Sequence, residues 1–199
     1  MARTIRGFLI AAALAAFAAP AGAQTYSDHY IFIKAVRDRD GAKVTSLVST
    51  PGSIVINAKD GETGDGALHI VTRDRDLTWL AYLIGKGARI DLQNDNGMTA
   101  LAMAAQIGWM PGAELLLGRG ASVDLANDNG ETPLMFAVRA RDVAMVRLLK
   151  SKGANPLKQD NIAGYSALDY AKRDPRAAAI VKVLEDNAPP ARPVMGPGL

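Results

Sequence analysis

The side chains that most often perform catalysis are scarce in this chain. Its 199 residues include two histidines, His29 and His69, and no cysteine. Thiol catalysis, a disulfide framework and zinc–thiolate sites are therefore excluded. His69 directly follows the apolar Leu68, and we expect it to be a structural hydrogen-bonding residue. His29 is expected to be solvated.

Carboxylates are the remaining groups from which acid–base chemistry could be built. Asp95 and Asp128 lie in two copies of the sequence Asn-Asp-Asn-Gly, at 94–97 and 127–130. Two such carboxylates could serve as general acid and base in a hydrolase. Aspartates in this setting more often only stabilise a turn, and no G-x-S-x-G, H-E-x-x-H or Walker sequence is present. We therefore do not expect an enzyme.

No metal and no cofactor are expected either. The acidic segment 60–66, DGETGDG, has the composition of a calcium loop. It lacks the ligand spacing of such a loop and a glutamate in register. A turn at the tip of a longer element is the better interpretation of this segment.

The first residues have the pattern of a secretory signal peptide. Two arginines precede an apolar run of 12 residues, 8–19, and the small residues Ala-Gly-Ala follow at 21–23. The run is shorter than the ~20 residues that cross a membrane. We predict cleavage after Ala23, with retention as an anchor as the alternative. The mature chain would carry 21 basic and 20 acidic residues, a balance that does not indicate nucleic-acid binding.

A turn followed by two apolar segments recurs along the rest of the chain. The copies are anchored at Leu68, Leu101, Leu134 and Leu168, which are spaced by 33, 33 and 34 residues. Phe32 holds the same place in an earlier copy, 36 residues before Leu68. A period of this length predicts a solenoid in which each copy is one supersecondary unit.

Each unit predicts two short helices. A hydroxyl residue stands where it can cap the first helix, at Thr99, Thr132 and Ser166. The first helix is rich in alanine, which lets neighbouring units approach, and the second is bulkier. A glycine follows the second helix, where a left-handed residue is favoured, at Gly87, Gly120 and Gly153. The chain must reverse its direction before each unit, and Asn-Asp-Asn-Gly consists of residues that favour such a turn.

The sequence GETPL at 130–134, with LLKSKGAN at 148–155, resembles the ankyrin repeat, a β-hairpin finger followed by a helix pair. The resemblance extends over residues 28–187. The family's proline is present only at Pro133 and its histidine only at His69. The glycine that usually ends the first helix is Gly108 in one unit, but arginine stands at this position in three others, at Arg39, Arg75 and Arg141.

The predicted fold is an all-α repeat solenoid of about five ankyrin-like helix-turn-helix units with short β-hairpin fingers. The domain spans residues 24–187, after the signal peptide at 1–23. Its units are predicted at 28–60, 61–93, 94–126, 127–160 and 161–187. The Pro- and Gly-rich tail at 188–199 is expected to be disordered.

The resemblance implies that partners bind at the finger tips and on the exposed face of the first helices. Carried over position by position, this face comprises Asp95, Asn96, Met98, Gln106, Ile107, Trp109, Asp128, Asn129, Glu131, Arg139, Tyr165 and Arg173. Trp109 is the first of these to test, because desolvated aromatic residues dominate interface energetics. Packing between helix ends is the alternative role for this residue.

An arginine also recurs near the end of the first helices. Arg37, Arg73, Arg139 and Arg173 share one position, and Gln106 interrupts them. Stacked units would align these side chains in a column. The column either complements the helix dipoles and forms surface ion pairs, or presents a basic strip to an acidic partner.

From these observations we predict a non-catalytic, monomeric protein-interaction module of the periplasm or cell exterior that holds or protects another exported protein. An inhibitor or immunity protein that neutralises one enzyme is the first alternative. A hydrolase that uses the finger carboxylates is the second.

Overall fold

The computed structural model describes residues 21–49 and 54–186. The predicted signal peptide, apart from residues 21–23, and the predicted tail lie outside these residues. In the described part the chain forms helices in consecutive pairs: α1 (Ala21–Arg37) and α2 (Gly41–Val48), α3 (Ala67–Arg73) and α4 (Leu77–Gly85), α5 (Ala100–Gln106) and α6 (Met110–Gly118), α7 (Pro133–Arg139) and α8 (Val143–Ser151), α9 (Ala167–Arg173) and α10 (Ala178–Glu185). Two short 3₁₀ turns, η1 (Val55–Asn57) and η2 (Pro175–Ala177), complete the set.

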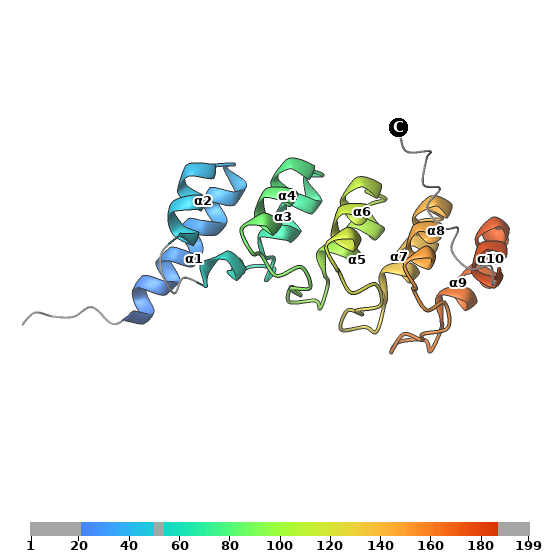
Figure 1. Ribbon diagram of the computed structural model, residues 1–199. Coiled ribbons are helices and arrows are strands. Elements are labelled where there is room, and N and C mark those ends of the chain that lie inside the picture. The colour runs from blue at the N-terminus through green and yellow to red at the C-terminus, as the bar shows by residue number, and fades with distance from the viewer. Residues whose placement is uncertain (1–20, 50–53, 187–199) are drawn as a thin grey trace, which may run out of the picture.

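The helix pairs follow one another in a single row, with the loops that join successive pairs projecting to one side (Figure 1). The first helices α1, α3, α5, α7 and α9 each pack against the next, and second helices lie behind them, with α4 against α6 and α8 against α10. This arrangement confirms the predicted all-helical repeat solenoid.

The anchor residues occupy equivalent sites in the core. Phe32, Leu68, Leu101 and Leu134 are all buried, with at most 2 % of their surface exposed. Leu168 is only partly buried, because no further described pair covers α9. The alanines of the first helices, such as Ala104 and Ala105, are fully buried and allow neighbouring helices to approach closely.

The predicted helix caps are present. Oγ1 of Thr99 accepts a hydrogen bond from the backbone N–H of Ala102, and Thr132 and Ser166 cap α7 and α9 in the same way. Gly87, Gly120 and Gly153 have φ of 92°, 89° and 91° behind the second helices. Local turn chemistry therefore sets the helix ends as the sequence indicates.

Three arginines adopt the left-handed conformation that glycine has at Gly108. Arg39, Arg75 and Arg141 have φ of 58°, 54° and 54°, a conformation that costs a non-glycine residue roughly 1–2 kcal/mol. Each side chain reaches the next helix pair: Arg39 donates to Asp76 (2.9 Å), Arg75 to the carbonyl of Ile107 (2.6 Å), and Arg141 to Asp174. The bridges between units offset the local strain.

The loops between pairs, which we call fingers, differ from the predicted β-hairpins. Among the described residues there is no strand, and only two isolated antiparallel bridges occur, Lys59 with Gly66 and Gln159 with Ser166. Each finger is instead a turn closed by a side chain. In the Asn-Asp-Asn-Gly fingers, Oδ1 of Asn94 accepts from the N–H groups of Asn96 and Met98.

Successive fingers are also bonded to one another. The backbone N–H of Asp95 donates to Thr63, that of Asp128 to Asn96, and that of Asn161 to Asn129, over 3.2, 3.3 and 2.8 Å. Each finger packs on the turn glycine of the finger before it. A Cβ on Gly97, for example, would lie 2.5 Å from the backbone nitrogen of Asp128. The recurring glycine is therefore needed for close approach as well as for its φ of 70°.

Candidate partner-binding surface

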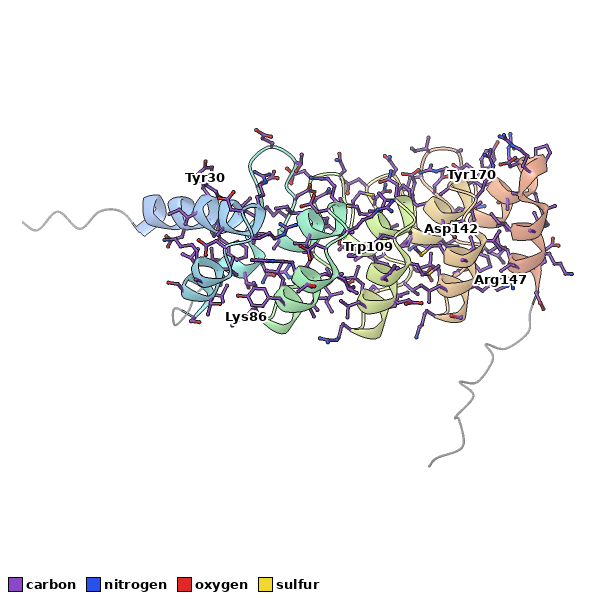
Figure 2. All side chains as sticks on the ribbon, turned by 90° about the horizontal axis from the view of Figure 1, so that it is seen from above. Tyr30, Lys86, Trp109, Asp142, Arg147 and Tyr170 are labelled. Atoms are coloured by element: carbon purple, nitrogen blue, oxygen red, sulfur yellow. The ribbon has the colours of Figure 1, made fainter. Side chains whose placement is uncertain are left out.

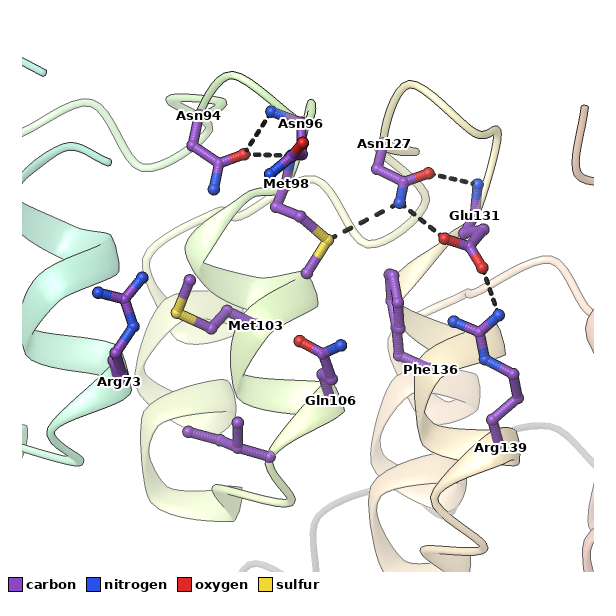
Figure 3. A pocket seen from close by; sticks show the side chains of 11 residues that line it. Arg73, Asn94, Asn96, Met98, Met103, Gln106, Asn127, Glu131, Phe136 and Arg139 are labelled. Atoms are coloured by element: carbon purple, nitrogen blue, oxygen red, sulfur yellow. Dashed lines mark hydrogen bonds and ion pairs between the residues drawn. The ribbon is translucent and has the colours of Figure 1, made fainter. Parts of the chain in front are cut away.

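An open hollow of about 430 Å³ lies between the fingers and the first helices in the middle of the row (Figure 3). Its walls come from α3, α5 and α7 and from the fingers that precede α5 and α7. The lining residues are Arg73, Asn94, Asn96, Met98, Met103, Gln106, Ile107, Asn127, Glu131, Phe136 and Arg139. Side chains of three consecutive helix pairs thus converge on one concavity.

The structure gathers only part of the predicted partner-binding set at this hollow. Seven of the predicted residues line it, namely Arg73, Asn96, Met98, Gln106, Ile107, Glu131 and Arg139. The others lie elsewhere: Asp95, Asp128 and Asn129 are exposed on the fingers, Tyr165 and Arg173 belong to the last described unit, and Trp109 is buried.

Four lining residues were not in the predicted set. Asn94 and Asn127 begin the two Asn-Asp-Asn-Gly turns, and Met103 and Phe136 stand at one repeat position, two residues after the anchor leucines. The bulk of Met103 in the alanine-rich helix α5, and of Phe136 at the same repeat position in α7, is the sequence signal that could have indicated them.

The expectation that Trp109 is exposed is wrong. Its side chain is only 6 % exposed and lies within the row of helices (Figure 2). A Cβ on Gly112, in the first turn of α6, would lie 2.1 Å from Cε3 of the indole. The ring therefore packs on the glycine, which is the structural alternative for this residue. Met98 is also largely buried, at 9 %, although it forms part of the floor of the hollow.

Three of the four arginines in the column contact the finger that precedes their own helix. Arg73 bonds Asp65, and Arg139 bonds Glu131; in both pairs the arginine follows the carboxylate by eight residues. Arg173 instead lies over the ring of Tyr165, with 4.3 Å from Cζ to the ring centroid. The fourth member, Arg37, donates to Asp60 over 2.8 Å. Because these guanidinium groups are paired, the column is not an unpaired basic strip.

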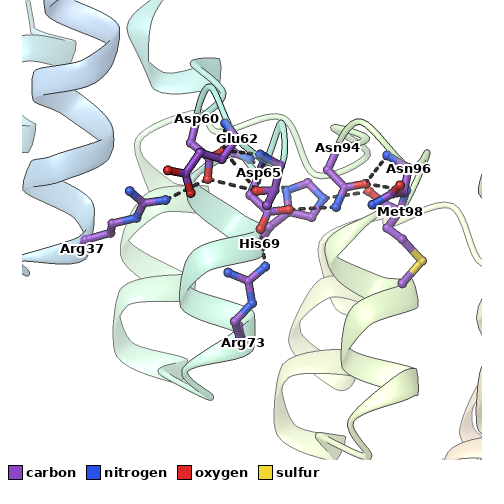
Figure 4. A network of polar contacts seen from close by, with 11 residues as sticks. Arg37, Asp60, Glu62, Asp65, His69, Arg73, Asn94, Asn96 and Met98 are labelled. Atoms are coloured by element: carbon purple, nitrogen blue, oxygen red, sulfur yellow. Dashed lines mark hydrogen bonds and ion pairs between the residues drawn. The ribbon is translucent and has the colours of Figure 1, made fainter.

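Asp65 is a buried carboxylate with two partners (Figure 4). Its residue is 0 % exposed, and it accepts from Arg73 and, over 2.8 Å, from Nδ2 of Asn94 in the next finger. Asp65 therefore lies beneath the first described finger and not at its tip. Removing either partner would leave a buried charge only partly compensated.

His69 has the structural role predicted from the sequence. Its Nδ1 accepts from the N–H of Gly66 at 3.2 Å, and Nε2 lies 2.8 Å from the carbonyl oxygen of Met98. The proton therefore resides on Nε2. Burial lowers the pKa of His69 below its ordinary value, which keeps the ring neutral in this network.

Glu131 is held in its charged form. Burial disfavours ionisation of this carboxyl, but hydrogen bonds from Asn127 and Arg139 outweigh burial, and the pKa of Glu131 is lowered. The Arg139 guanidinium also lies 4.9 Å from the ring centroid of Phe136. The charged groups at this end of the hollow thus have partners within the protein.

The two carboxylates named for the hydrolase alternative lie on the fingers. Asp95 and Asp128 do not line the hollow, and each packs over the glycine of the preceding finger. Nowhere in residues 28–49 and 54–186 do three or more His, Cys, Asp or Glu side chains gather as metal ligands. In the same described part of the chain, no helix has the length and apolar character needed to cross a membrane.

Comparisons with known proteins agree with the helix-pair architecture. The chain matches the family described as ankyrin repeats (3 copies) over residues 68–160 and 110–190. It is also similar to an ankyrin repeat-containing protein of Treponema pallidum (strain Nichols), with 40 % identity over 123 residues. That similarity covers 60 % of this chain and 41 % of the relative, so the chain spans less than half the length of the relative.

These repeats are in general non-catalytic and indicate a protein–protein interaction module. The period of the anchor leucines, the row of helix pairs and the match over residues 68–190 support one assignment. The chain belongs to the ankyrin repeat family.

Proposed function

We propose that this protein is exported to the periplasm or beyond the cell and there binds another exported protein. The partner contacts the hollow between α3, α5 and α7 and the neighbouring finger tips. The protein acts as a monomer and takes no part in nucleic-acid binding, in keeping with the balanced charge of residues 24–199.

The observation that supports binding at this place is the convergence of three helix pairs on one hollow of about 430 Å³. Concave sites with a few polar groups over an apolar floor are typical of recognition. Gln106 and Arg73 are exposed at its rim, whereas Met98, Met103 and Phe136 form the buried floor. A partner would therefore find both hydrogen-bonding groups and apolar surface here.

Export is supported by the N-terminal sequence, with its two arginines, apolar run and Ala-Gly-Ala segment. Cleavage after Ala23 would remove only the first three residues of α1, which extends from Ala21 to Arg37. Cell fractionation and N-terminal sequencing of the protein from its native host test this part. A mature protein that begins at Gln24 in the exported fraction is expected, and a cytoplasmic protein that retains Met1 would refute export.

Binding is tested by site-specific photocrosslinking in the native host. A photoreactive residue replaces Gln106 at the hollow, and Glu114, exposed on α6 outside the hollow, provides the matched control. A defined adduct from position 106 but not from position 114 is expected. Equal adducts at both positions, or none at position 106, would count against the proposed surface.

The same captured partner allows the inhibitor alternative to be tested. If the partner is an enzyme, its activity is measured with and without the protein. A holding or protecting role leaves the activity intact, whereas neutralisation abolishes it.

A further inference from the structure

Two repeat positions that carry a charged or cation–aromatic pair in the units of α3, α7 and α9 are uncharged in the unit formed by α5 and α6. The finger position holds Asp65, Glu131 and Tyr165 in other units, and here it holds Met98. The helix position eight residues later holds Arg73, Arg139 and Arg173 elsewhere, and here it holds Gln106. Both members of the pair are replaced together, at the centre of the hollow.

We infer that Met98 and Gln106 form a subsite for an uncharged, apolar side chain carried on an extended segment of the partner. This inference rests on the proposed function, because it names the chemistry of the occupant at the same surface. The specificity for the partner's side chain then lies at Met98 and Gln106, where the column of arginine pairs is interrupted.

The floor of the subsite is fixed in position. The carbonyl of Met98 is held by Nε2 of His69 at 2.8 Å, and its N–H donates to Oδ1 of Asn94 at 3.0 Å. Its sulfur lies 3.8 Å from Nδ2 of Asn127, so the thioether bridges two fingers (Figure 3). An occupant would meet a preformed thioether surface, and methionine sulfur adapts well to apolar and aromatic side chains.

The charges around the subsite favour an uncharged occupant. Arg73 and Arg139 are each bonded to a carboxylate, and Glu131 is the partner of Arg139. A charged side chain entering between these pairs would lose its hydration without finding an unpaired counterion. An apolar side chain would gain from burial against Met98, Met103 and Phe136.

Gln106 supplies the polar group that an extended segment requires. It is exposed at the rim of the hollow, and its side-chain amide makes no hydrogen bond to the described residues. An amide can both donate to and accept from a peptide backbone. The segment can therefore be held by its backbone at Gln106 while one side chain enters over Met98.

The test uses small probes and the full chain with isotope-labelled methionine methyl groups. N-acetyl-leucine N-methylamide is titrated into the protein, followed by its aspartate and lysine counterparts. Saturable shifts of the Met98 and Met103 methyl signals are expected with the leucine probe only. Met135 and Met145, which are 0 % exposed, are the internal controls that should not respond.

Two double variants exchange the pairs that the chain already contains. Met98→Glu with Gln106→Arg copies the pair at 131 and 139. Binding of the leucine probe, followed by the Met103 methyl signal, should weaken by at least about tenfold, since apolar surface is replaced by charge. Glu131→Met with Arg139→Gln copies the pair at 98 and 106. It should create a second apolar subsite and raise the number of bound probes.

The inference is overturned if the charged probes shift Met98 and Met103 as strongly as the leucine probe, or if no probe shifts them. It is also overturned if the double variant M98E/Q106R retains full binding with an unchanged circular dichroism spectrum. A missing crosslink at position 106 in cells would instead refute the proposed function, so the two failures are distinguishable.

Discussion

The imidazole Nε2 of His69 lies 2.8 Å from the carbonyl oxygen of Met98, so a side chain of the α3 helix holds the finger that precedes α5. The neutral ring serves as acceptor for Gly66 and donor to Met98. A second proton on Nδ1 would break the bond from Gly66. The bond from Gly66 to the ring therefore depends on the protonation state of His69, whereas Nε2 can donate to Met98 in both states.

Stability should fall on mild acidification because of His69. Burial lowers its folded-state pKa from 6.5, so the unfolded chain binds a proton first as the pH falls. The contribution is present above the unfolded pKa and is lost as the pH falls toward the folded value. Urea unfolding should show the free energy of unfolding decreasing from about pH 7 to about pH 5. This window lies above the usual carboxylate range.

His69→Gln should remove this pH dependence of the free energy of unfolding. His29→Gln should retain it, because His29 takes no part in the contacts of His69 with Gly66 and Met98. An equal slope in the His69→Gln variant and the wild type would contradict the assignment.

Gly97→Ala should destabilise the protein more than Gly164→Ala. Both glycines end a finger turn, with φ of 70° and 67°, so alanine adds similar strain of roughly 1–2 kcal/mol at each. Only at Gly97 would the new Cβ collide with the next finger, 2.5 Å from the nitrogen of Asp128; at Gly164 nothing lies within 4 Å. Denaturant unfolding measures the difference, and equal losses would show that finger stacking contributes nothing.

Gly112→Ala and Gly118→Ala, both within α6, should change stability in opposite directions. At Gly112 the Cβ would meet the indole of Trp109 at 2.1 Å, and overpacking of this kind costs about 1–3 kcal/mol. At Gly118 nothing lies within 4 Å, so alanine should stabilise the helix by roughly 0.5–1 kcal/mol. Thermal unfolding gives the sign, and a shifted tryptophan emission in the Gly112→Ala variant would report the displaced ring.

Tyr170 should ionise at unusually high pH. Its hydroxyl donates to Oδ2 of Asp160, and this bond, with burial and the charge of Asp160, raises the pKa of Tyr170 to about 12. The contribution to stability is full below the unfolded pKa of about 10 and is lost as the pH rises through about 12. Tyrosinate absorbance measures this titration.

Asp160→Asn should lower the pKa of Tyr170 toward 10.0 while preserving the turn, because asparagine already holds the same position at Asn94 and Asn127. A titration that Asp160→Asn leaves unchanged would refute the role of this hydrogen bond. The Tyr170→Phe variant lacks this titration, so the comparison identifies which part of the absorbance change belongs to Tyr170.

The sequence by itself determined the repeat, the helix ends and the absence of thiol chemistry. These features depend on interactions within a few residues or on a fixed period. The hydroxyl of Thr99 caps α5, and Gly120 follows the end of α6. The spacing of Leu68 and Leu101 indicates equivalent places in a common core. Such local preferences act in the same way in every unit, so one sequence is sufficient to detect them.

Tertiary structure alone decided which side chains are accessible and which charges are paired. Trp109 is buried because Gly112 leaves room for its ring, and Arg139 is paired because a finger places Glu131 beside it. The stacking of Asp128 on Gly97 likewise requires the next unit to be in place. Burial and pairing depend on distances between residues of different elements, and these distances are set only when the helix pairs pack together.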